Sequence, residues 1–253
     1  MLARLADRLL LCPSRNVLPI DEKLPRRLPH RAGELEVFTM RPEAAREPQA
    51  FVLKFSGAGG RAERAGIHPA EIWPQLNAEV WAVNYPGYGN SSGRASLNAL
   101  VAAAQATYEH LAEIAAGRPI IVTGNSIGCT CALYLAARMP IAALLLRNPP
   151  PLRQVIVGRF GWWNLGLGAG LIARQVPHEL CSLSNAAQAQ APSVFVTSGA
   201  DRIVPPQYQQ RIFDAYAGPK RQIVDPAADH ATPLASELEP EYRQALDWLA
   251  GQL

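Results

Sequence analysis

Residues 119–128 read PIIVTGNSIG, and a helical pattern, IGCTCALYLAARM, follows over 127–139. The first residues form an apolar run that is typical of a buried strand. A strand that gives way to a helix at once needs a sharp turn. Gly124 and Gly128 permit that turn, because side chains at these positions would collide with the neighbouring strand and helix. The stretch therefore predicts a strand–turn–helix unit with Ser126 at its apex.

The turn also suggests chemistry, because Gly124–Gly128 matches the pattern G-x-S-x-G. In this setting the serine sits in strained backbone and its oxygen is raised above the sheet as a nucleophile. The start of the following helix favours the negative charge that develops there. An ordinary strand-to-helix turn is the alternative, and the strand before Ser126 and the helix after it favour the nucleophile.

A serine nucleophile needs a base, and the base needs a group that orients it. His230 lies in DPAADHATP, directly after the strand pattern RQIVD at 221–225. Asp201 ends the strand pattern SVFVTSGAD at 193–201, at the sheet edge where such sheets place their sites. The chain order serine, acid, histidine is the one expected for this turn. We therefore predict Ser126, Asp201 and His230 as a catalytic triad.

Two further carboxylates and four further histidines compete for these roles. Asp225 and Asp229 also lie close to His230 in the sequence, so the choice of acid stays open between them and Asp201. The remaining histidines fall within or near predicted helices, in a loop or in the insertion described below, and none of them has the right element and order: His30, His68, His110 and His178.

The rest of the chain alternates between strand and helix patterns, which predicts a mostly parallel, twisted sheet with helices on both faces. Further strands are expected at 34–40, 50–55, 80–85 and 141–147. Further helices are expected at 66–76, 96–117, 206–218 and 235–253. The alternation stops between about 149 and 192, so we predict one domain over 1–253 with one insertion.

The glycine-rich turn KFSGAGGRA at 54–62 allows two interpretations. Gly57, Gly59 and Ala62 fit the loose dinucleotide pattern G-x-G-x-x-[GA], but the next strand ends in Asn84 where an acidic residue would bind the ribose. The alternative is an oxyanion hole, in which glycines let the backbone approach the substrate. We therefore assign the N–H groups of Ala58 and Ile127 as the predicted oxyanion donors.

Composition restricts the remaining function classes. The chain has 253 residues, of which 49% are hydrophobic and 18% charged, and its net charge of +3 is too small and too evenly spread to indicate nucleic acid as a partner. Four cysteines do not make a disulfide framework. We expect reduced thiols, a cytoplasmic protein, a small-molecule or acyl substrate, and no metal or organic cofactor.

The N-terminal stretch MLARLADRLLLCPSRN carries leucines at helical spacing, which gives one apolar face. Arg4, Asp7 and Arg8 interrupt any signal-peptide core. The apolar face has two possible partners, a membrane surface or the protein's own core. We expect it to pack on the core.

Several motifs together resemble the α/β-hydrolase superfamily, and more closely its small-lid serine hydrolases of the acyl-protein thioesterase-like and esterase-like branch. The similarity spans about residues 34–250 and is carried by FSGAGG, NYPGYGNSSG at 84–93, GNSIG and SGADRIVPP. Three residues depart from that branch: Ser56 replaces its usual histidine, Ala58 its usual asparagine, and Asp229 the small residue that usually precedes the catalytic histidine.

The resemblance implies an α/β-hydrolase fold in which the insertion at about 149–192 is a small lid. The insertion is rich in apolar and glycine residues, so it either forms a mobile cover over an acyl pocket or packs on the edge of the sheet. The expected function is hydrolysis of an ester or a thioester through an acyl-enzyme intermediate. Acyl transfer by the same triad, peptide cleavage and a non-catalytic binding role are the alternatives.

Overall fold

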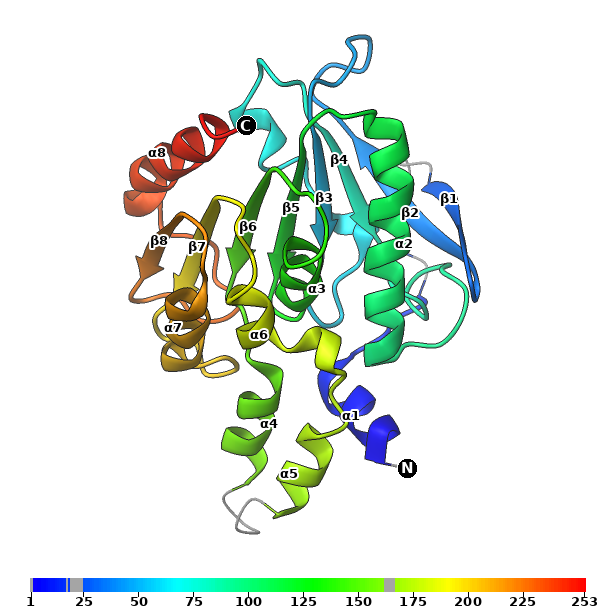
Figure 1. Ribbon diagram of the computed structural model, residues 1–253, viewed down its shortest axis with the longest axis vertical. Coiled ribbons are helices and arrows are strands. Elements are labelled where there is room, and N and C mark those ends of the chain that lie inside the picture. The colour runs from blue at the N-terminus through cyan, green and yellow to red at the C-terminus, as the bar shows by residue number, and fades with distance from the viewer. Residues whose placement is uncertain (1, 17, 19–24, 162–166) are drawn as a thin grey trace.

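The computed structural model describes residues 2–16, 18, 25–161 and 167–253, and within them eight strands form one sheet (Figure 1). The strand order is β1-β2-β4-β3-β5-β6-β7-β8. β2 runs antiparallel to both of its neighbours, and all pairs from β4 to β8 are parallel. The strands are β1 (Pro25–His30), β2 (Gly33–Met40), β3 (Phe51–Phe55), β4 (Glu79–Val83), β5 (Ile120–Asn125), β6 (Ala143–Arg147), β7 (Ser193–Ser198) and β8 (Lys220–Asp225).

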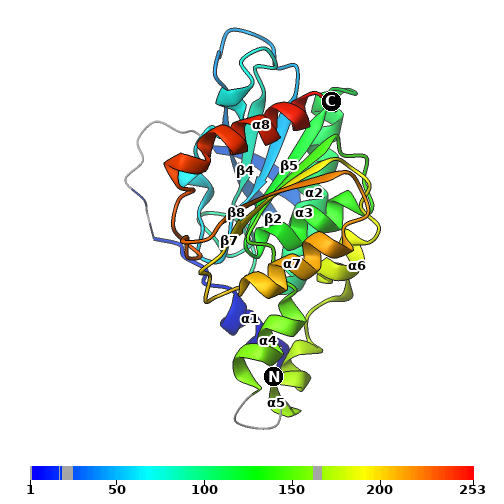
Figure 2. The same cartoon turned by 90° about the vertical axis from the view of Figure 1, so that its left-hand side faces the viewer.

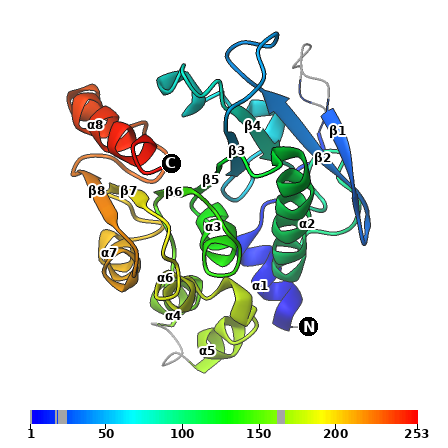
Figure 3. The same cartoon turned by 45° about the horizontal axis from the view of Figure 1, so that its top comes forward.

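Helices cover both faces of the sheet, so the predicted fold class is confirmed (Figures 1 and 3). α2, α3, α6 and α7 lie on one face, and α8 lies on the other. The α-helices are α1 (Leu2–Leu10), α2 (Leu97–Ala115), α3 (Gly128–Ala136), α4 (Leu152–Phe160), α5 (Leu167–Ala173), α6 (Ser182–Ala186), α7 (Pro206–Ala215) and α8 (Glu239–Ala250). Short 3₁₀ helices are η1 (Ala62–Arg64), η2 (Ala70–Ile72), η3 (His178–Leu180) and η4 (Ser236–Leu238).

The central strands are continuously buried, which explains their uninterrupted apolar sequences. Every residue of β4 and of β7 is buried, and β5 is buried up to the exposed Asn125 at its end. Helices on both faces exclude water from these strands, and apolar area removed from water is the main stabilising term. These strands therefore form the buried centre of the sheet, and their carboxyl ends carry the predicted site residues Ser126 and Asp201.

The structure departs from the predicted elements in two places, a strand that was not predicted and a helix that does not form. β1 was not predicted, because PRRLPH contains two prolines and alternates poorly; the antiparallel hairpin with β2 supplies its pairing. The helix expected at 66–76 does not form, and only the single turn η2 lies there. Pro69 and Pro74 have no N–H to donate, so a continuous α-helix is interrupted.

The insertion between β6 and β7 contains α4, α5, η3 and α6. α6 packs against α3 and α7, whereas α4 and α5 pack against each other and project beyond the carboxyl edge of the sheet (Figures 1 and 2). Residues 162–166, which include Trp162, Trp163 and Leu165 of the predicted lid, lie outside the described residues.

The N-terminal helix α1 lies beside α5 at the same end of the molecule. Only part of it packs on the core: Ala6 and the following Leu11 are buried, but Leu2, Leu5 and Leu9 are exposed. The expectation that the leucine face packs on the protein's own core therefore holds for Leu10 and not for Leu2, Leu5 and Leu9. Among the described residues no helix has the length and apolar character needed to cross a membrane.

Candidate active site

Ser126 occupies the predicted turn between β5 and α3, in a left-handed backbone conformation with φ of +52°. Gly124 and Gly128 are required because a side chain at either position would clash with neighbouring backbone. A Cβ on Gly124 would lie 2.6 Å from Cys129 Cα, and one on Gly128 would lie 2.2 Å from the carbonyl oxygen of Phe55. A left-handed serine is uncommon and strained. The packing of α3 against β5 and β3 holds it there.

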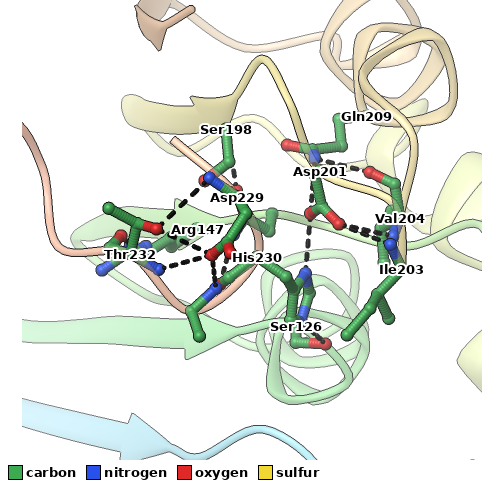
Figure 4. A network of polar contacts seen from close by, with 12 residues as sticks. Ser126, Arg147, Ser198, Asp201, Ile203, Val204, Gln209, Asp229, His230 and Thr232 are labelled. Carbon is green, nitrogen blue, oxygen red and sulfur yellow. Dashed lines mark hydrogen bonds and ion pairs between the residues drawn. The ribbon is translucent and has the colours of Figure 1, made fainter. Parts of the chain in front are cut away.

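The structure brings Ser126, His230 and Asp201 into one hydrogen-bonded chain (Figure 4). His230 Nδ1 lies 2.6 Å from Asp201 Oδ2, and His230 Nε2 lies 3.0 Å from Ser126 Oγ. A carboxylate only accepts hydrogen bonds, so Nδ1 carries the proton. The neutral imidazole then has Nε2 free to accept the hydroxyl proton of Ser126.

Asp201 is buried and firmly held. Its Oδ1 accepts the backbone N–H groups of Ile203 and Val204, both at 2.8 Å, and its Oδ2 accepts Gln209 Nε2 at 3.1 Å. Burying a carboxylate is costly unless donors surround it, and here four donors do. Sequence reasoning missed Gln209, which lies on α7 eight residues after Asp201.

The two alternative acids, Asp225 and Asp229, accept hydrogen bonds within the loop that carries His230. Asp225 accepts the N–H groups of Ala227, Ala228 and Ala235, and these bonds, that from Ala235 foremost, lower the pKa of Asp225. Asp229 accepts the hydroxyl and the N–H of Thr232 and the N–H of Ala231.

The Thr232 hydroxyl bond is the main reason that the pKa of Asp229 is lowered. Neither of these carboxylates has a hydrogen bond to the His230 ring among the described contacts. Of the three candidate acids, the structure places Asp201 against the imidazole.

Residues at the end of β6 attach the same loop to the sheet. Asn148, buried and left-handed with φ of +52°, donates from Nδ2 to the His230 carbonyl at 3.2 Å and accepts the Ser198 N–H. The Arg147 guanidinium donates to the Thr232 carbonyl. The sequence analysis gave Asn148 no role. It could have been found as an asparagine directly after a strand, because asparagine tolerates left-handed backbone.

The glycine turn after β3 lies beside the serine. A Cβ on Gly57 would be 3.3 Å from Ser126 Cβ. The Ser126 N–H is bound to the Arg147 carbonyl at 2.8 Å. By contrast, the N–H groups of Ala58 and Ile127, the predicted oxyanion donors, have no acceptor among the described residues. Ala58 is exposed, whereas the Ile127 side chain is buried.

Buried polar residues support this turn from behind. The Tyr85 hydroxyl donates to the Ser56 carbonyl at 3.1 Å. Asn84 accepts the Ala62 N–H at 2.9 Å and donates to Glu36 and Glu63, both at 2.8 Å. Asn84, which argued against a dinucleotide site, thus has a structural role.

Glu63 belongs to the same buried network, and two opposing effects act on its carboxyl group. Burial alone would raise the pKa of Glu63. Hydrogen bonds from Arg61 and Asn84 outweigh burial, and the pKa is lowered. The carboxylate form is therefore stabilised as the acceptor that this network needs.

A cavity of about 620 Å³ adjoins the turn on the α8 face of the sheet. Gly57 and Asn125 line it next to the serine, and Arg147, Pro233 and Leu234 line it next to the histidine loop. Its size is in the range of small-molecule sites. Ser126, Asp201 and His230 are not among its lining residues, so the cavity adjoins the predicted triad and does not contain it.

The other chemistry-bearing side chains lie elsewhere. Burial raises the pKa of the Cys131 thiol to about 12 and that of Cys129 further, so both stay protonated within α3. In the part of the chain that the structure describes, no group of three or more His, Cys, Asp and Glu side chains is arranged to hold a metal ion.

Comparison with known proteins gives a family match. The model of the alpha/beta hydrolase family matches residues 55–241, a range that includes the three residues of the predicted triad. An uncharacterized protein of Mycobacterium tuberculosis is 34% identical over 179 residues, covering 70% of this chain and 60% of that protein. The protein bem46 of Schizosaccharomyces pombe is 28% identical over 196 residues, covering 75% and 64%. The chain thus spans about three fifths of the length of these relatives.

Among solved structures, an esterase of Pyrococcus furiosus superposes with a TM-score of 0.69 at 16% identity, covering 96% of this chain and 97% of that one. Est1E from Butyrivibrio proteoclasticus also gives 0.69 at 16% identity, covering 90% and 98%. At such low identity the likeness shows a shared fold and nothing finer.

Proposed function

The chain belongs to the alpha/beta hydrolase family, and on this premise we propose that it is a serine hydrolase that cleaves an ester or a thioester. The observation that carries the proposal is the hydrogen-bonded chain from Ser126 through His230 to Asp201. Nucleophile, base and orienting acid are already within hydrogen-bonding distance, as this chemistry requires.

In the proposed reaction, Ser126 Oγ attacks the acyl carbonyl while its proton passes to His230 Nε2. Asp201 stabilises the imidazolium that forms and fixes its orientation. His230 then gives that proton to the departing alcohol or thiol, and an acyl-enzyme remains. A water molecule next loses a proton to Nε2 and attacks the acyl carbon. The carboxylic acid leaves and Ser126 recovers its proton.

Each attack places negative charge on the carbonyl oxygen. We assign the N–H groups of Ala58 and Ile127 as the donors to this oxyanion. Both lack an acceptor among the described residues. The position of Gly57, where an added Cβ would lie 3.3 Å from Ser126 Cβ, supports the assignment because it shows that the turn lies next to the proposed nucleophile. Preorganised donors of this kind are commonly the largest single contribution to catalysis.

We further propose that α4 and α5 act as a small lid and that the cavity beside Gly57 and Asn125 receives part of the substrate. The projection of these helices beyond the carboxyl edge supports the first assignment, and the position of the cavity supports the second. We also propose a cytoplasmic location, which the four free cysteines support because reducing compartments preserve thiols.

The test is labelling with a fluorophosphonate probe, comparing wild type with Ser126→Ala, together with hydrolysis of p-nitrophenyl esters of increasing chain length and of matched thioesters. Loss of labelling and turnover together in Ser126→Ala would support the proposal, and the chain-length profile would size the acyl pocket. A folded wild type that neither labels nor turns over would instead indicate a non-catalytic binding role.

A panel of alcohol acceptors separates hydrolysis from acyl transfer. Products that contain the added alcohol in preference to the free acid would indicate an acyltransferase built on the same triad. The free acid alone would indicate a hydrolase.

A further inference from the structure

Exposed apolar side chains gather at one end of the molecule. Seven large hydrophobic side chains are exposed among the described residues, and only Ile203 and Val224 lie outside this group. The other five lie on α1, α4 and α5, and we call them the apolar patch: Leu2 (36% exposed), Leu5 (41%), Leu9 (40%), Val157 (40%) and Leu171 (49%). Single exposed leucines are ordinary, but a group on adjoining helices indicates an interaction surface.

The three helices form one continuous unit. α5 packs against both α1 and α4, and all three lie together beyond the carboxyl edge of the sheet (Figures 1 and 2). α1 is attached to the rest of the protein by the buried Ala6, by Leu10, which packs against the core, and by Asp7, which accepts the N–H of Leu97 at 2.9 Å. The leucines of the patch are therefore held outward by the way that α1 docks.

The exposed charged side chains on and beside these three helices are all positive. Arg4 and Arg8 on α1, Arg159 on α4 and Arg174 just after α5 are exposed. The described residues of the three helices contain one carboxylate, Asp7, and it is bound to the start of α2. An apolar face flanked by arginines on a short amphipathic helix is typical of segments that lie in the plane of a membrane surface.

We propose that α1, α4 and α5 dock the protein onto an anionic lipid bilayer, with the apolar patch among the acyl chains and the arginines at the headgroups. Charge complementarity selects this occupant. A second copy of the chain, related by a two-fold axis, would bring arginines against arginines around the patch. Anionic headgroups neutralise them instead.

Docking in this way sets the orientation of the site. Ser126 lies at the carboxyl edge, the same edge from which α4 and α5 project. The bilayer would therefore face the end of the molecule that carries the nucleophile. Docking itself needs neither Ser126 nor catalysis, so its test is independent of the proposed hydrolase activity.

The experiment is flotation of the full chain with vesicles of phosphatidylcholine alone and of phosphatidylcholine mixed with phosphatidylglycerol, at low salt. Wild type should float with the mixed vesicles and less with the neutral ones. The double variant Leu5→Ser/Leu9→Ser should lose binding by about tenfold or more, because two leucines no longer enter the bilayer. Val224→Ser, which removes a side chain of similar exposure on β8, should bind like wild type.

Two more variants test the proposal even if the Leu5→Ser/Leu9→Ser substitutions disturb the folding of α1. Leu171→Ser changes α5 alone and should also weaken binding. Arg4→Gln/Arg8→Gln should reduce binding to mixed vesicles severalfold and leave binding to neutral vesicles little changed. Arg243→Gln, an exposed arginine on α8, is the matched control. Circular dichroism and the melting temperature verify that each variant is folded.

Three outcomes would overturn the proposal. The first is a folded wild type that floats with neither vesicle, and the second is Leu5→Ser/Leu9→Ser binding as tightly as wild type. The third is a dimer in sedimentation experiments that Leu5→Ser/Leu9→Ser converts to a monomer, because the patch would then be an interface between two copies.

Discussion

The two sides of the nucleophile are held in opposite ways. On the acid–histidine side, Asp201, Asp225 and Asp229 each accept at least three hydrogen bonds. On the glycine side, the N–H groups of Ala58 and Ile127 have no acceptor among the described residues. The carboxylates on the acid–histidine side thus have their hydrogen bonds before substrate binds, whereas the N–H donors on the glycine side have no partner among the described residues. The proposed hydrolase needs this division, because its oxyanion donors would bind charge only in the transition state.

The largest effect on activity is expected when one of these aspartates is replaced by asparagine. Asp201→Asn should lower kcat for a p-nitrophenyl ester by about 10⁴-fold, because the amide favours the wrong tautomer of His230. Asp225→Asn changes the last residue of β8, which has no hydrogen bond to the imidazole among the described residues, and should cost far less. Equal losses in steady-state assays of the two variants would remove Asp201 from its proposed role.

The glycine side can be tested by adding a single methyl group. Gly57→Ala places a Cβ at 3.3 Å from Ser126 Cβ, so the turn or the serine must shift. Because small misplacements near reacting atoms are costly, kcat should fall by about 100-fold. Gly66→Ala is the matched control, since a Cβ there meets nothing within 4 Å. A Gly57→Ala variant with the turnover of Gly66→Ala would contradict the proposed position of the oxyanion turn.

The support behind that turn should have a smaller effect. Tyr85→Phe removes the hydrogen bond to the Ser56 carbonyl and should lower kcat by about 2–10-fold, along with about 1 kcal/mol of stability. Tyr108→Phe removes a bond to the Pro140 carbonyl, far along the chain from the turn. It should lower the free energy of unfolding by a similar amount without changing kcat. Parallel denaturation and kinetic measurements separate positioning from general stability.

The smallest effect concerns pH and the His230 loop. Hydrogen bonds, led by that from Ala235, hold the pKa of Asp225 below its ordinary value. The stability that its carboxylate contributes is therefore complete above the unfolded pKa of about 3.9 and is lost as pH falls through the lower folded value. The difference in melting temperature between wild type and Asp225→Asn should stay constant near neutral pH and narrow below about pH 4. A difference that widens in acid would show that the carboxylate is not the stabilised form.

Local sequence patterns predicted the sheet and the placement of the site with few exceptions. G-x-S-x-G between a strand and a helix is a short-range signal, and the chain order of Ser126, Asp201 and His230 follows from the fold. The structure brings these three together over 29 and 104 residues of separation. β1 escaped prediction because its pairing with β2, a tertiary contact, overrides the unfavourable prolines.

The residues whose roles the sequence did not reveal are those whose roles depend on tertiary contacts. Gln209 and Asn148 are ordinary polar residues in the sequence, and only their burial against Asp201 and the His230 loop gives them a role. The same limit applies to α1. The helical spacing of its leucines identified one apolar face, but this spacing does not specify whether the face contacts protein or solvent. In the structure Leu5 and Leu9 are exposed.

The backbone of Ser126 has a consequence for protein engineering. Its φ of +52° is a conformation that glycine adopts freely and that costs a residue with a side chain about 1 kcal/mol or more. A directed-evolution campaign that rewarded heat resistance alone would therefore favour glycine at position 126. The resulting protein would melt at a higher temperature than its parent and would lack the proposed nucleophile, so any search for more stable variants has to select for turnover at every round.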